Sequence, residues 1–273
     1  MMRATERPAA IAAALVLVIG MGFGRFAFTG LYPLMVSDGQ ITVEGGSYAA
    51  SANYAGYLIG ALLAGVLSGV SSRMLCAFSM AATVVALGLL AFAIPEWLVV
   101  AIRGVAGVAS AIAMVAASHW LIHDRHHHHG APALFAGVGV GIFVSAEIIA
   151  AGSWASLSSY ALWLLLALAA LAIGLVTYFL QAREDFHEPE REISPHEKVA
   201  SPTLAIGPGR LIVIYGLAGF GYIITATYLP LLVGSALATI DPTHIWAVFG
   251  LGAIPSCFLW HFLHERWGTS RSL

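Results

Sequence analysis

Long apolar runs alternate with short polar breaks along most of the chain. A helix needs about 20 apolar residues to cross a bilayer core about 30 Å thick, and each run reaches that length. The breaks carry turn-forming and polar residues, such as Ser37-Asp38-Gly39 and Asp241-Pro242. The pattern therefore predicts an all-α polytopic membrane bundle with eight spanning helices, at residues 9–36, 46–70, 73–94, 96–121, 131–151, 159–181, 210–237 and 243–264.

The composition agrees with a membrane protein and excludes two other classes. Hydrophobic residues make up 59% of the chain and charged residues 10%, whereas a soluble domain has about 25% charged residues. A soluble globular enzyme needs more surface charge than this. The net charge is −2 and there is no basic patch, which excludes a nucleic-acid-binding chain. We therefore expect the lipid bilayer as the main surrounding and no nucleic-acid partner.

The positions of lysine and arginine predict the orientation of the bundle. Arg25 and Arg103 lie inside predicted helices. If the N-terminus is placed in the cytoplasm, all the remaining lysines and arginines fall in cytoplasmic segments and none falls in an outer loop. We therefore expect a multi-pass protein of the inner (plasma) membrane with a cytoplasmic N-terminus. The basic residues on the cytoplasmic side are Arg3, Arg7, Arg73, Arg125, Arg183, Arg191, Lys198, Arg210, Arg266 and Arg271.

Residues 182–209 separate the sixth and seventh predicted helices and differ from the segments around them. This segment is rich in proline and in residues of both charges, and it has little apolar content. Such a composition is typical of a flexible linker. The predicted organisation is a six-helix transmembrane bundle at residues 1–181, a cytoplasmic linker at 182–209 and an incomplete C-terminal bundle at 210–273.

A short motif of the first predicted helix recurs in the seventh. Gly22-Phe23-Gly24 corresponds to Gly219-Phe220-Gly221, and Pro33-Leu34 corresponds to Pro230-Leu231 at the same offset. Both copies begin on the same side of the membrane, so the repeat is parallel, as in transporters built from two six-helix bundles. The second copy has two predicted helices where the first has six. The sequence therefore predicts a chain truncated after its eighth helix, with about 8 of 12 transmembrane helices.

The first predicted helix resembles a known family. Its segment Gly22–Pro33, GFGRFAFTGLYP, resembles the G-x-G-R-F-A-[YF]-[ST]-x-x-x-P pattern of the YbfB/YjiJ family in the major facilitator superfamily. Residues 46–60 of the second helix fit the family too, and the segment 103–107, RGVAG, resembles the R-x-x-x-G motif of the superfamily's fourth helix. The resemblance implies a solute carrier of the major facilitator type and implies no particular substrate.

Three ionisable residues lie well inside predicted helices: Arg25, Arg103 and Glu147. A charge at the centre of a spanning helix costs about 2.5–3.5 kcal/mol on insertion scales, so each of them needs a partner or a function. A rise of about 1.5 Å per residue places all three at a similar depth. We expect one polar cluster, in which Glu147 pairs with an arginine and the remaining positive charge binds an anionic substrate group. Glu147 could instead bind a coupling proton, and the alternative to both is an ion network that only holds helices together.

Further candidates are polar side chains and prolines inside the predicted helices. Asn53 and Tyr57 lie four residues apart on one face of the second helix, and Tyr222 occupies the repeat position of Arg25. These three side chains could bind a substrate in a central cavity, or they could form hydrogen bonds between helices. Pro33 and Pro230 are hinge candidates, because proline interrupts the hydrogen-bond ladder of a helix.

A histidine-rich run fills the break between the fourth and fifth predicted helices, at residues 123–129. Neighbouring histidines can bind zinc or nickel. A metal transporter would also need ligands inside its helices, so we interpret the run as a polar loop with incidental metal affinity. We expect no metal site, no cofactor and no catalytic residue.

These observations together predict a secondary active transporter that moves a small, unidentified solute by alternating access. The chain contains no ATP-binding motif, which implies that an ion or proton gradient drives transport. The alternative is a protein that does not transport, either a truncated fragment or a partner subunit of a membrane protein. A membrane-embedded enzyme is disfavoured because the helices carry no pattern of nucleophile and base.

Overall fold

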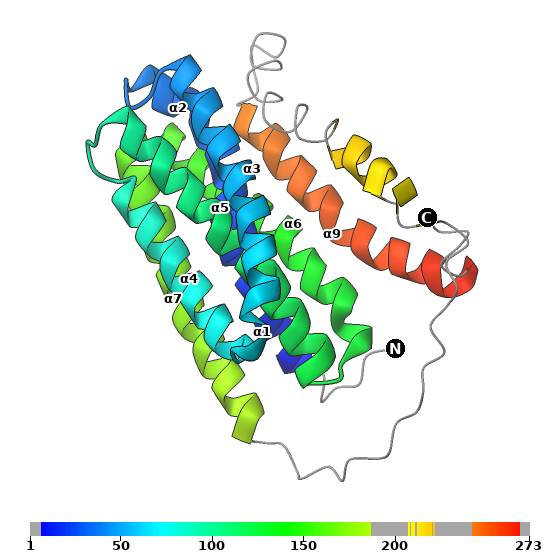
Figure 1. Ribbon diagram of the computed structural model, residues 1–273. Coiled ribbons are helices and arrows are strands. Elements are labelled where there is room, and N and C mark those ends of the chain that lie inside the picture. Colours follow the sequence, from blue (N-terminus) through cyan, green and yellow to red (C-terminus); the bar gives the residue numbers. More distant parts are fainter. Residues whose placement is uncertain are drawn as a thin grey trace, which may run out of the picture.

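The computed structural model is a bundle of helices (Figure 1). Within the part of the chain that it describes, seven helices are long and apolar enough to span a membrane. They coincide with seven of the eight predicted runs, which confirms the all-α membrane architecture for these segments. The eighth run, at 210–237, lies largely outside the described residues, which are 7–186, 207, 209–210, 212–219, 221 and 242–267.

Several spans are assembled from more than one helical piece. The first span consists of an α-helix, a π-helical segment and a second α-helix, and short 3-10 or π-helical turns adjoin three others. The elements in chain order are α1 (Arg7–Leu17), η2 (Val18–Phe26), α2 (Ala27–Ser37), α3 (Val43–Val66), η3 (Leu67–Gly69), α4 (Ser72–Leu89), α5 (Glu96–His119), η4 (Trp120–Asp124), η5 (His128–Gly130), α6 (Ala131–Trp154), α7 (Ser159–Phe186) and α9 (Pro242–Trp267).

The first span forms the centre of the bundle. Ala9, Ala13 and Leu17 are fully buried, and the span packs against α4, α5, α6 and α7. The outer helices instead expose large apolar side chains, such as Val66, which is 81% exposed. A surface of this kind is unfavourable in water and suits the hydrocarbon core of a bilayer.

The π-helical segment η2 brings the first span into close contact with α6. Its sequence, VIGMGFGRF, carries glycines at alternate positions, 20, 22 and 24. A Cβ atom on Gly22 would overlap the backbone of Gly141 on α6, so both residues must lack a side chain for the helices to approach this closely. Such contacts between small residues are a common way to pack helices in membranes. A π-helical segment within a spanning helix often marks a functional site.

Acidic residues tie the connections together at one end of the bundle. An Asp38 carboxylate oxygen accepts a hydrogen bond from the Ser159 backbone N–H at 2.6 Å, and a Glu96 carboxylate oxygen accepts one from the Thr42 N–H at 2.7 Å. The side chain of Gln40 donates to the Leu90 carbonyl at 2.8 Å. These bonds link the loops that join α2 to α3, α4 to α5 and α6 to α7.

The last described helix, α9, lies along α6 (Figure 1). A Cβ atom on Gly139 would come within 2.7 Å of the Gly250 carbonyl oxygen, so glycine permits close packing here as well. The Trp246 indole N–H donates to the Phe26 carbonyl at 3.1 Å, which links α9 to the end of η2. α9 contains Pro255, and α2 contains Pro33. The bend of α9 in Figure 1 is the expected effect of a proline within a helix.

Candidate functional site

Arg103 and Arg25 lie next to each other in the core of the first six helices. Arg103 projects from α5 and is 2% exposed. Its guanidinium donates hydrogen bonds to the Gly24 carbonyl at 2.7 Å and to the Arg25 carbonyl at 3.1 Å, both at the end of η2. The same guanidinium lies 4.4 Å from the centroid of the Phe28 ring. The carbonyls and the ring face together stabilise a positive charge that has no contact with bulk water.

Aromatic rings surround the guanidinium of Arg25. Its central carbon lies 4.2 Å from the centroid of the Tyr57 ring, 4.9 Å from that of Tyr54 and 5.5 Å from that of Phe26. Tyr54 and Tyr57 are three residues apart on α3, so their rings share one face of that helix. Cation–π contacts of this kind hold a cation in place.

The side chain of Asn53 connects two helices. Its amide donates a hydrogen bond to the Arg103 carbonyl at 2.9 Å, and the residue is buried. Asn53 was considered as a substrate ligand and as a source of a hydrogen bond between helices. The structure contains such a hydrogen bond, from α3 to α5. The bond also fixes the backbone of α5 at the residue that carries the buried guanidinium.

A small pocket opens beside the two arginines, between η2, α2, α3 and α5. Its volume is about 10 Å³, which is room for about one water molecule. Two of its described lining residues are basic and none is acidic, so the lining carries positive charge. These residues are Arg25, Phe26, Phe28, Thr29, Ala50, Asn53, Tyr54 and Arg103.

Glu147 does not join this cluster. Its carboxylate pairs with His244 at 3.1 Å, and the side chains are 42% and 49% exposed, respectively. The expected pairing of Glu147 with Arg25 or Arg103 is therefore wrong. The sequence gives the depth of each residue along its helix, but it does not give the face of the helix on which the side chain lies. Glu147 points from α6 toward α9, whereas the arginines meet between η2 and α5.

Sequence reasoning missed some residues at these sites, and two of its candidates lie outside the residues that the structure describes. Tyr54, Phe28 and His244 are not among the predicted site residues. The spacing of two tyrosines at three residues is a signal for Tyr54, but no sequence signal links His244 to Glu147. Tyr222 and Pro230 lie outside the described residues.

A second group of polar side chains could hold a metal ion. His129, His261 and Glu265 each offer one ligand atom, and these atoms lie within 4.8 Å of one another. Among the described residues, the histidine-rich run thus contributes a side chain to a cluster that the sequence did not reveal.

The comparison with known families decides the class of the protein. Residues 17–273 match the family described as "Uncharacterised MFS-type transporter YbfB". The chain belongs to this family. The YbfB match confirms the resemblance found in the first helix, the major facilitator type of the fold and a role in membrane transport. No curated protein matches the chain at a significant level. Membership of the YbfB family also indicates a transporter rather than an enzyme, and it leaves the substrate open.

Proposed function

We propose that the chain is a secondary active transporter that binds a small anionic solute at Arg25 and Arg103 and moves it across the membrane by alternating access. The observation that carries this proposal is the pocket with two guanidinium groups and no acidic residue among its described lining residues. Guanidinium groups bind carboxylates and phosphates through paired N–H donors. Because Glu147 pairs with His244 instead, it does not neutralise the pocket.

The two arginines have different tasks in this proposal. Arg103 is fully buried and donates to two backbone carbonyls, so it supplies a fixed positive field. Arg25 is half-buried and lines the pocket, and aromatic rings hold its guanidinium in place, so we assign it the contact with the solute. We propose that the small pocket widens when the protein opens toward one side of the membrane.

The proposal includes an arrangement in the membrane. Residues 1–181 form one bundle, residues 182–209 form a cytoplasmic linker and residues 210–273 belong to a second bundle that moves against the first. The protein lies in the inner membrane, with its N-terminus in the cytoplasm. The distribution of basic residues supports this orientation, and the parallel repeat supports two bundles. Pro33 and Pro230 remain hinge candidates.

Arg25→Gln is expected to reduce solute flux at least tenfold, because one charged hydrogen bond contributes about 1.5–3 kcal/mol. The chain is reconstituted in liposomes with an imposed pH gradient. Uptake of labelled succinate, sulfate and phosphate is measured separately for the unmodified chain and each variant.

The matched control is Arg7→Gln, which makes the same chemical change at an exposed residue outside the site and should stay within about twofold of the unmodified chain. Both variants must elute as folded protein before their flux is compared. Equal flux in Arg25→Gln and Arg7→Gln would contradict the role of Arg25. Absence of uptake for every anion tested would contradict anion transport.

Glu147 and His244 are the proposed site of the coupling proton, since this pair of a carboxylate and an imidazole joins α6 to α9. Glu147→Gln is expected to retain exchange of the solute across the liposome membrane when the pH is equal on both sides. Its accumulation of solute under a pH gradient should be about tenfold lower than that of the unmodified chain. The two rates are measured on the same preparation. Accumulation that matches the unmodified chain would remove Glu147 from the coupling mechanism.

A further inference from the structure

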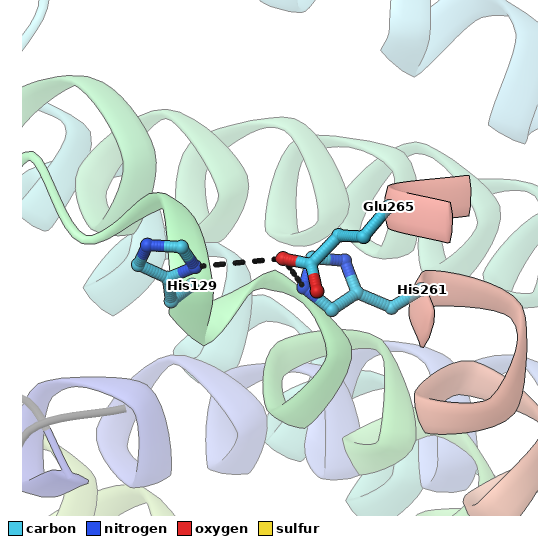
Figure 2. A group of neighbouring side chains, drawn as sticks. All are labelled: His129, His261 and Glu265. Carbon is cyan, nitrogen blue, oxygen red and sulfur yellow. Dashed lines mark ion pairs between the residues drawn. The ribbon is translucent and has the colours of Figure 1, made fainter. Parts of the chain in front are cut away.

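Three side chains converge where α9 passes the beginning of α6 (Figure 2). The Glu265 carboxylate oxygen lies 3.2 Å from His261 Nε2 and 3.9 Å from His129 Nδ1. His261 and Glu265 are four residues apart on α9, so they share one face of the helix. His129 comes from η5, the short turn directly before α6.

We propose that His129, His261 and Glu265 form a binding site for a divalent transition-metal ion, with Zn²⁺ as the preferred ion. Two imidazoles and one carboxylate are a common protein ligand set for Zn²⁺, with a fourth position left for water. Ca²⁺ and Mg²⁺ prefer sites made of oxygen ligands, so this set favours a first-row transition metal over them.

The geometry requires only small side-chain movements. Ligand atoms around a tetrahedral Zn²⁺ lie about 3.3 Å apart, and the three atoms here lie within 4.8 Å of one another. The side chains of His129 and Glu265 are 60% and 54% exposed, so they can change rotamer without disturbing the core. His261 also lines an open groove beside the start of α6, which provides a path for the ion.

The ligands lie on elements that are already packed together. α6 and α9 are in close contact through Gly139 and Gly250, which limits how far His129 and the two α9 ligands can separate. The site is therefore largely preformed, unlike an isolated run of histidines in a loop. A bound ion would link the η5 turn to α9 and stabilise the contact between the first six helices and the last described one.

The test is Zn²⁺ binding to the purified full chain, produced without a polyhistidine tag. One Zn²⁺ per chain is expected by isothermal titration, and Co²⁺ in its place should give the visible absorption of a tetrahedral complex. His261→Ala and Glu265→Gln should each weaken Zn²⁺ binding at least tenfold. At Zn²⁺ about a hundredfold above its Kd, the melting temperature of the unmodified chain should rise by about 5–10 °C.

The matched control is His128→Ala, which removes an exposed neighbour of His129 from the same run and leaves the three ligands intact. It should bind Zn²⁺ within twofold of the unmodified chain, whereas His129→Ala should lose at least tenfold. Equal weakening by these two variants would assign the affinity to the histidine run and overturn the site. Unchanged binding in the conservative variant Glu265→Gln would overturn it as well. These measurements need no transported solute, so they are independent of the proposed transport function.

Discussion

Gly22→Val is expected to leave little or no folded protein. A side chain at Gly22 would overlap backbone atoms of Gly141, and a backbone cannot rotate away as a flexible side chain can. Separating η2 from α6 would break the central contact of the bundle. We expect a cost of about 3 kcal/mol or more, which is a large part of the roughly 5–15 kcal/mol that stabilises a typical protein. The measurement is the fraction of a fluorescent fusion that elutes as one sharp peak in size-exclusion chromatography.

The chain offers a matched control in Gly65→Val. Gly65 also lies in a spanning helix, but a Cβ atom there would have no neighbour within 4 Å. This variant makes the same chemical change and should elute like the unmodified chain. If Gly22→Val eluted as well as Gly65→Val, the close approach of η2 and α6 would be wrong.

Arg103→Met is expected to lower the free energy of unfolding by about 3 kcal/mol. Methionine keeps much of the side-chain volume, but the carbonyls of Gly24 and Arg25 lose a charged donor inside the core. A buried acceptor left without its partner costs about 1–3 kcal/mol. For a chain of this size the melting temperature should fall by about 6–12 °C, as measured by a thermal shift in detergent.

Arg7→Met is the control for this experiment, because it makes the same chemical change at an exposed residue at the start of α1. The melting temperature of this variant should change by no more than about 2 °C. A drop in Arg103→Met no greater than in Arg7→Met would mean that the two carbonyl contacts contribute nothing to stability.

The amino-acid sequence is sufficient to predict the seven spanning helices that the structure describes and the residues that need explanation. Length and apolar content locate the spans, because a bilayer core requires about 20 apolar residues in each of them. Burial of charge is costly in a membrane, so Arg25 and Arg103 stand out as candidates from their positions in apolar runs. The structure places these two residues side by side.

Other features depend on information that a sequence pattern does not carry. The π-helical form of η2 changes the direction in which Arg25 points, and no residue pattern indicates it. Asn53 suits a substrate ligand and a link between helices alike, because both roles use the same amide. The contact of Glu147 with His244 depends on how α9 packs on α6, which periodicity within one helix cannot reveal.

The acidic anchors at one end of the bundle affect how the molecule can move. Asp38 and Glu96 form hydrogen bonds between neighbouring loops, and Gln40 forms a third. These bonds join the connections of the first six helices to one another at that end. We therefore expect the motion of the proposed transport cycle to occur where α9 meets α6, and not among the connections of the first six helices.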